Sequence, residues 1–161
     1  MAPHTSNIDG LIGISAIQSL RVQVRFMGKH TLFEGRLGRF MYWLGGIPVN
    51  RDSARDVVDQ TTAVMRETPL WLGLAPEGTR TGAKRWKTGF YRIAEQMAVP
   101  IVVLGFCYRR RQVRIVDCFL PTGDMDADMA RMVASLVDIV PRKPALLSAP
   151  LKAAKAARGI A

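Results

Sequence analysis

The sequence predicts an α/β fold in which a mixed, largely parallel central sheet is flanked by helices. The main observation is that strand-like and helix-like segments alternate along the chain, a pattern typical of parallel sheets with helical crossovers. The second is size, because 161 residues suffice for one domain with a sizeable core. The third is composition, since 48% hydrophobic and 22% charged residues are ordinary for a globular protein. Whole-chain disorder, collagen and coiled coil are therefore excluded.

The first half of the chain contains three predicted strands with helices between them. Strands are predicted from alternating or short apolar runs, and helices from apolar residues that recur on one face. In chain order, we expect a helix over residues 9–20, a strand over 21–27, a short helix over 35–44, a strand over 45–51, a helix over 53–67 and a strand over 70–76.

The second half begins with a predicted helix over residues 88–98 and ends its regular pattern with a helix over 124–140. Between them lie two strand-like segments, residues 100–108 and 112–119. The short "RRRQ" sequence that separates them is a turn, so we expect these two strands to form an antiparallel hairpin.

From Pro141 the sequence changes character, with three prolines, five basic residues and no acidic residue over 141–161. We therefore expect a folded domain over residues 1–140 and a basic C-terminal tail over 141–161. Chain ends are commonly loose, which favours a disordered, solvated tail. Alternatively, the part after Pro150 could form a short basic helix on a membrane surface.

The chain carries 23 Lys and Arg against 13 Asp and Glu, a formal net charge of +10 at pH 7. This excess favours an anionic partner, which could be nucleic acid, an acidic membrane surface or a phosphate-bearing substrate. The longest nearly unbroken apolar run, residues 98–108, is far shorter than the roughly 20 residues that a spanning helix needs. A protein of this kind that works at a membrane is expected to lie on its surface.

The two cysteines, Cys107 and Cys118, are too few for a disulfide framework. We expect both to be buried thiols that pack as small hydrophobic residues in a reducing compartment. No Cys/His cluster has the spacing of a zinc site, so we expect no metal.

Four residues separate His4 from Asp9 at the expected start of the first helix. This spacing can bring the carboxylate back to the imidazole, where it would hold one ring nitrogen as a donor and stabilise the imidazolium. The pair alone has two interpretations: a general base with its orienting carboxylate, or an exposed histidine beside a helix-capping aspartate.

Three further segments stand out, and two of them suit an anionic ligand. In "APEGTRTG" (75–82), Arg80 offers a planar fork for phosphate, and Gly78 lets the backbone approach closely. Arg51 ends "GGIPVNR" and could reach the same phosphate. "VPIVVLGF" has Pro100 at its first strand position, where proline is tolerated. Each segment alone could equally be a surface turn or part of the core.

Together and in this order, these segments resemble the four blocks of the glycerolipid acyltransferase family, of which 1-acylglycerol-3-phosphate acyltransferase is the familiar member. The resemblance spans about residues 3–120. The matching segments are "HTSNID" with His4 and Asp9, "GGIPVNR" with Arg51, "APEGTRT" with Glu77 to Arg80, "VPIVVL" with Val99 and Pro100, and "GKHTLF" with Lys29.

The resemblance implies an O-acyltransferase with the glycerol-3-phosphate acyltransferase-like fold. His4 would take the proton from the acceptor hydroxyl as this attacks a thioester, and Asp9 would orient His4. No metal or cofactor is implied. The residues that would bind the acceptor's phosphoglycerol head group are Lys29, Arg51, Glu77, Gly78, Thr79 and Arg80.

The implied donor is acyl-CoA or acyl carrier protein, and the implied acceptor is lysophosphatidate or a related lysophospholipid. We expect a cytoplasmic protein, peripheral at the inner face of the cell membrane, with residues 84–87 and 109–114 attracted to anionic lipid. Trp86, Phe90 and Tyr91 could add interfacial contacts, unless Phe90 belongs to the core. We expect no nucleic-acid partner, because the basic residues are spread along the chain and form no known recognition motif.

The chain departs from the family pattern in two blocks, with Ala75 for a common Phe and Leu104 for the second proline of the last block. His4 also stands close to Met1, where family members have a preceding strand and often helices. We therefore expect that strand to be missing and His4 to lie on a fraying end. Two alternatives to acylation of lysophosphatidate follow: acylation of another lipid acceptor, and a truncated member that binds phosphate or lipid without catalysis.

Overall fold

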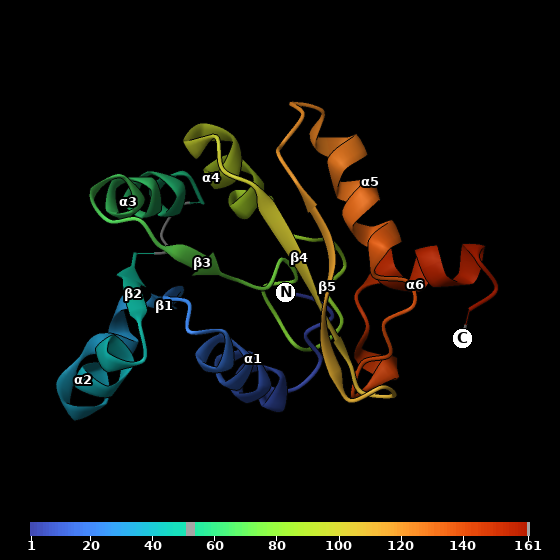
Figure 1. Cartoon of the computed structure of the whole chain (residues 1–161), viewed down its shortest axis with the longest axis horizontal. Helices are drawn as coiled ribbons and strands as arrows, with labels where there is room; N and C mark the ends of the chain where they lie inside the picture. Colours follow the sequence, from blue (N-terminus) through green and yellow to red (C-terminus); the bar gives the residue numbers. More distant parts are fainter. Residues whose placement is uncertain (51–53, 161) are drawn as a thin grey trace. The chain divides into compact units, whose positions relative to one another are not determined.

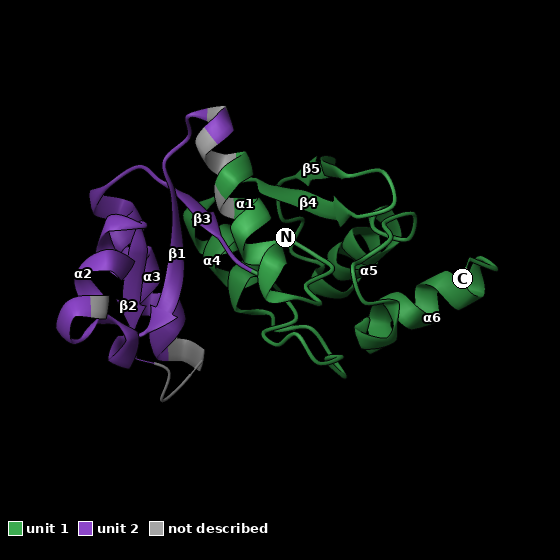
Figure 2. Cartoon of the chain, turned by 90° about the horizontal axis from the view of Figure 1, so that it is seen from below, with its two compact units in different colours: residues 1–16, 75–161 green, residues 17–74 purple. Residues whose placement is uncertain are grey.

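The computed structural model describes residues 1–50 and 54–160, and the chain divides into two compact units (Figure 2). The first unit contains residues 1–16 and 75–161, and the second contains residues 17–74. Helix α1 (Asn7–Leu20) begins in the first unit, and its last residues belong to the second. The predicted mixed α/β class with parallel strands is confirmed, and the described strands form two separate sheets.

The second unit is built on a parallel sheet in which β1 (Val24–Lys29) lies between β2 (Gly46–Val49) and β3 (Trp71–Gly73) (Figure 1). Parallel neighbours need a long connection, which explains why helices separate these strands in the sequence. The connecting elements are the 3-10 helix η1 (His30–Phe33), α2 (Gly35–Trp43) and α3 (Ala54–Glu67).

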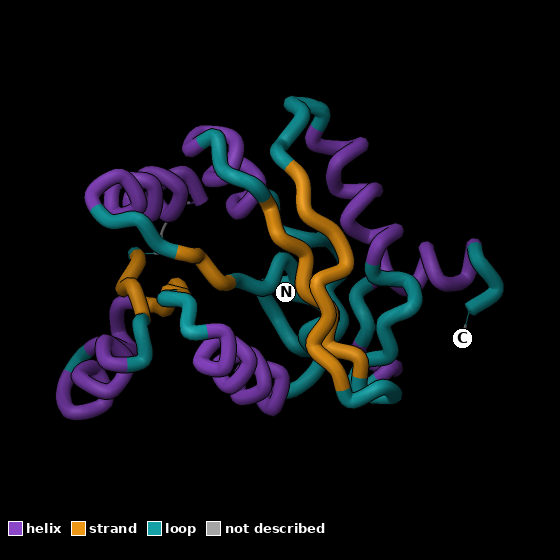
Figure 3. Tube along the Cα trace, viewed as in Figure 1, coloured by secondary structure: helices purple, strands orange, loops and turns teal. Residues whose placement is uncertain are grey.

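The first unit is built on the antiparallel hairpin of β4 (Ile101–Cys107) and β5 (Gln112–Phe119), drawn as the two long orange strands of Figure 3. Helix α4 (Gly89–Met97) precedes the hairpin and α5 (Met125–Ser135) follows it. The predicted hairpin through the arginine-rich turn is confirmed.

Helix α5 ends at Ser135 although its apolar pattern predicts a helix to residue 140. The N–H of Ile139 donates to the carbonyl of Leu136 at 3.0 Å, so the chain turns there. Leu136, Val137 and Ile139 are each buried, and Pro141 could not continue a helix. The apolar residues that suggested more helix are therefore core residues of a turn.

The core of the first unit brings together side chains from α4, α5, the hairpin and both ends of the chain. Helix α5 packs against β5 and against the C-terminal helix α6 (Ala149–Ala157). The buried residues of this cluster are Ala2, Trp86, Tyr91, Ala94, Ile101, Val103, Cys107, Phe119, Met132, Leu136, Ile139, Leu147 and Leu151.

The backbone before His4 is held by the hairpin. Ala2 pairs with Gly105 in a parallel bridge, and its N–H donates to the carbonyl of Leu104 at 2.9 Å. Ala2 itself is 1% exposed. The expectation that His4 lies on a fraying end is therefore wrong, because backbone pairing anchors the residues in front of it.

The segment after residue 140 is folded where we expected a loose tail. The 3-10 helix η2 (Pro144–Leu146) is followed by α6, in which Leu151 is fully buried and joins the core. Burial of apolar side chains in this segment outweighs the usual looseness of a chain end. The interpretation of the segment as a disordered, solvated tail is therefore wrong. A domain boundary at residue 140 stays a prediction.

Two further expectations about individual side chains are wrong. Trp86 and Tyr91 are buried and cannot contact a lipid interface, whereas Phe90 packs against the core as its alternative interpretation had it. Cys107 is buried as predicted, but Cys118 is exposed because it lies on the outward side of β5. Among the residues that the structure describes, no helix is long and apolar enough to cross a membrane.

Candidate active site

The His4–Asp9 segment is closed by its own hydrogen bonds. Asp9 lies in the first turn of α1, and its Oδ2 accepts the backbone N–H groups of Thr5 at 2.7 Å and Ser6 at 2.8 Å. The Ser6 Oγ in turn accepts the N–H of Ile8 at 3.2 Å. These reciprocal contacts resemble a capping box. In that motif, the side chain three positions after the helix-capping residue accepts the backbone N–H of the capping residue. The spacing of the motif is thus explained by local helix-start geometry.

The imidazole of His4 faces the same carboxylate, with Nδ1 at 3.3 Å from Oδ2 of Asp9. The His4 side chain is 22% exposed and that of Asp9 is fully buried. Burial lowers the pKa of His4, and the charge of Asp9 opposes this only in part. The imidazole is therefore neutral at pH 7. With Nδ1 directed at Asp9, the other ring nitrogen, Nε2, is left to accept a proton.

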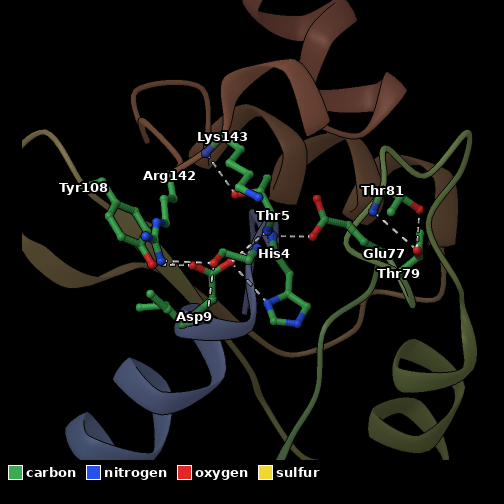
Figure 4. A network of polar contacts seen from close by, with 11 residues as sticks. His4, Thr5, Asp9, Glu77, Thr79, Thr81, Tyr108, Arg142 and Lys143 are labelled. Atoms are coloured by element: carbon green, nitrogen blue, oxygen red, sulfur yellow. Dashed lines mark hydrogen bonds and ion pairs between the residues drawn. The ribbon is translucent and has the colours of Figure 1, made fainter.

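Tyr108 is a member of this site that sequence reasoning missed. It follows β4, and its hydroxyl donates to Oδ1 of Asp9 at 2.5 Å (Figure 4). Burial, and then the hydrogen bond to Asp9, raise the pKa of Tyr108 to about 12, so the phenol keeps its proton. Its sequence signal is weak, because an aromatic residue at the end of an apolar strand most often belongs to the core.

The segment after residue 140 also reaches the site. The Arg142 guanidinium donates to Ser6 Oγ at 3.4 Å, and the backbone N–H of Lys143 donates to Thr5 Oγ1 at 3.3 Å (Figure 4). Arg142 is exposed, so its charge stays available at the rim. Neither contact is expected of a disordered, solvated tail.

Glu77 supports His4 from the opposite side. The carboxylate is 3% exposed and accepts the backbone N–H of His4 at 2.5 Å (Figure 4). Burial raises the pKa of Glu77, while hydrogen bonds from His4 and from the hydroxyl of Ser148 oppose the shift. Ser148 is itself fully buried and accepts the indole N–H of Trp86 at 3.0 Å. This burial favours a supporting role for Glu77 over the direct contact with substrate that we expected.

The rest of the Glu77 loop is open to solvent. Gly78, Thr79 and Arg80 are all exposed, and Gly78 has φ +64°, a conformation that other residues rarely adopt. Thr79 and Thr81 share a hydrogen bond between their hydroxyls at 2.9 Å. The charge of Arg80 lowers the pKa of His4, which places this guanidinium within electrostatic reach of the imidazole.

Two of the predicted residues, Lys29 and Arg51, belong to the sequence range of the second unit. Lys29 is exposed at the end of β1 in the second unit. Arg51 lies outside the described residues. Their expected contacts with the acceptor stay predictions. Among the residues described, no group of three or more His, Cys, Asp or Glu side chains is placed to hold a metal ion.

The assembled side chains form a neutral imidazole, a buried carboxylate that orients it and a cationic rim. Such a site can remove a proton from a hydroxyl that is held nearby. The pair of His4 and Asp9 needs no nucleophilic side chain when the hydroxyl itself attacks.

Comparison with known proteins identifies the family. The family model described as Acyltransferase matches residues 1–106, about two thirds of the chain, and this region contains both His4 and the Glu77 loop. Neither curated proteins nor solved structures gave a match. The family match and the site together lead to one conclusion: this chain belongs to the glycerolipid and lysophospholipid acyltransferase family.

Proposed function

We propose that this protein transfers a fatty acyl group from acyl-CoA or acyl carrier protein to the free hydroxyl of lysophosphatidate or a related lysophospholipid. The observation that supports this best is the imidazole of His4, whose Nδ1 lies 3.3 Å from Oδ2 of the buried Asp9. A base of this kind must be unprotonated at neutral pH, and burial provides that condition here.

In the proposed reaction the acceptor hydroxyl is the nucleophile. Its oxygen forms a bond to the thioester carbonyl carbon while Nε2 of His4 takes the hydroxyl proton. Asp9 stabilises the imidazolium that forms. The carbon–sulfur bond then breaks, and the leaving thiolate receives the proton from His4. The products are a phospholipid ester and a free thiol, and no acyl-enzyme forms.

We assign the exposed part of the loop to the acceptor. Arg80 pairs with the phosphate as a planar fork, and Gly78 and Thr79 offer backbone and hydroxyl groups beside it. Lys29 and Arg51 are proposed as further ligands of the head group.

The buried Glu77 and the half-buried Tyr108 position the base. Glu77 holds the backbone of His4, and Tyr108 holds the second oxygen of Asp9. Neither needs to touch substrate, so both are positioning residues in this proposal. Together they connect the base to the Glu77 loop and to the end of β4.

The test measures thiol release from long-chain acyl-CoA with lysophosphatidate as acceptor. His4→Ala should abolish the acceptor-dependent release. His30→Ala is the matched control, because His30 is the other histidine and is exposed in the second unit. Equal release from wild type and His4→Ala would refute the mechanism.

The alternative is a family member that binds phosphate or lipid without catalysis. Wild-type protein that binds lysophosphatidate but releases no thiol with a panel of acyl-CoA, acyl carrier protein and lysophospholipid acceptors would support it. Release with only one acceptor of the panel would instead identify the substrate.

A further inference from the structure

Helix α2 exposes three aromatic side chains and buries Gly38. Trp43 is 75% exposed, and Phe40 and Tyr42 are both about half exposed. Gly38 is buried, and a Cβ at that position would lie 1.9 Å from the carbonyl oxygen of Phe33. The helix therefore packs through a glycine and leaves its aromatic rings in solvent.

The inner contact of this helix is already complete. Phe33 fills the space beside the sheet, where a Cβ on Gly28 or Gly46 would meet its ring at 2.7 Å. The Phe33 ring also packs edge-on against Tyr42 at 5.0 Å between centroids. Rotation of α2 to bury Phe40 or Trp43 would have to displace Phe33. The outward aromatic rings are thus a consequence of how the second unit is packed.

The exposed rings are grouped with cations. Phe40 and Trp43 stack with their centroids 5.8 Å apart. Arg36 and Arg39 precede them by four residues each, so the spacing of a helix puts an arginine beside each ring. Both arginines are exposed, and α2 contains no acidic residue. Single exposed apolar side chains are ordinary, but a grouped patch with a cationic border marks an interaction surface.

We propose that Arg36, Arg39, Phe40 and Trp43 form a docking face for the surface of an anionic lipid bilayer. Aromatic rings with a polar edge settle at the head-group level of a bilayer, and neighbouring arginines attract anionic lipids. A helix with both features lies in the plane of the interface. The net charge of +10 has the sign that this partner requires.

This inference rests on the proposed function, because the lysophospholipid acceptor resides in a bilayer. It assigns the membrane-contacting aromatic residues to a different part of the chain from the one that the sequence suggested. Trp86 and Tyr91, expected at the interface, are core residues of the first unit, whereas the exposed aromatic cluster belongs to α2 in the second unit. Docking through α2 places lipid against residues 17–74, the same unit that contains Lys29.

The experiment is cosedimentation with vesicles of phosphatidylcholine, with and without anionic phosphatidylglycerol. Wild type should bind the anionic vesicles more tightly. Trp43→Ala should weaken this binding at least about tenfold, as expected for loss of a large apolar side chain from the interface. Replacement of Arg36 or Arg39 by Gln should weaken it about fivefold each at low salt and leave binding to neutral vesicles unchanged.

Trp71→Ala is the matched control. Trp71 is 53% exposed on β3 of the same unit, but it lies outside the docking face. It should leave vesicle binding unchanged. Equal loss in Trp43→Ala and Trp71→Ala, or no binding by wild type, would overturn the docking face. The docking face would also be overturned if wild type were a dimer that Trp43→Ala dissociates, because a second copy would then cover the helix.

Activity separates this inference from the proposed function. With a short-chain lysophospholipid dispersed as monomers, Trp43→Ala should match wild type, while with acceptor in vesicles it should be slower by the same factor as its binding. Vesicle binding without any thiol release would refute acyl transfer and leave the docking face standing. Equal rates of the two proteins on vesicles would refute the docking face and leave acyl transfer standing.

Discussion

Tyr108→Phe removes a single hydroxyl from the site. In the structure this hydroxyl donates to Oδ1 of Asp9 at 2.5 Å, while Oδ2 accepts the N–H groups of Thr5 and Ser6. Asp9 is fully buried, so water cannot easily replace the lost donor. The substitution therefore removes the phenol donor from Oδ1 and leaves the contacts of Oδ2 as they were.

The size of the effect follows from these contacts. A hydrogen bond to a charged group contributes about 1.5–3 kcal/mol. Because Oδ2 keeps its two amide donors, we expect the lower end, which is about tenfold in kcat. The charge of Asp9 raises the pKa of His4, and without the phenol more of that charge acts on the imidazole. We therefore expect the acid limb of the pH–rate profile to move to higher pH.

The assay is thiol release from acyl-CoA with lysophosphatidate, measured as kcat, KM and pH profile for each variant. Tyr91→Phe is the matched control. Tyr91 is buried, and like that of Tyr108 its hydroxyl donates to a carboxylate, here Asp128, at 2.9 Å. It should lower the melting temperature without changing the pH profile. Rates and acid limbs that are the same in Tyr108→Phe and wild type would refute the assignment of Tyr108 as a positioning residue.

Three further predictions concern stability. Leu151→Ala should lower the free energy of unfolding by about 2–5 kcal/mol in urea titrations, because Leu151 is fully buried in α6. Glu77→Gln keeps an acceptor for the N–H of His4 and should melt above Glu77→Ala, which leaves that N–H unpaired. Burial raises the pKa of Glu77 above its ordinary value of 4.5. The stability that the protonated carboxyl contributes is therefore fully present below pH 4.5 and is lost as pH rises through the raised pKa. Glu77→Gln should remove this pH-dependent loss. Hydrogen bonds, first from the Thr122 N–H, hold the pKa of Asp128 below 3.8. Its contribution is present above that pH and lost below it, so Asp128→Asn should flatten the acid side of a melting-temperature profile.

Helices and strands were predicted well where short-range sequence patterns indicate them. The hairpin, the connecting helices and the strands occur where the apolar periodicity indicates them, within a few residues at their ends. The prediction was wrong where packing overrides local pattern. The segment after residue 140 has the prolines and charges of a tail, yet Leu151 has a place in the core. Trp86 and Tyr91 have the amphipathic character of interfacial residues, yet Ser148 and Asp128 satisfy their polar atoms inside the protein.

The sequence by itself determined the pair of His4 and Asp9, because every contact that closes this segment joins residues two to five positions apart and depends on the start of one helix. Only the tertiary structure decided what surrounds the pair. Tyr108 reaches Asp9 across 99 residues, Glu77 reaches His4 across 73, and Arg142 reaches Ser6 across 136. No periodicity along the chain encodes such distances, because they arise when the hairpin, the Glu77 loop and the last segment close around one core. The outward aromatic face of α2 has the same origin, since the position of Phe33 against three glycines leaves those rings no space inside.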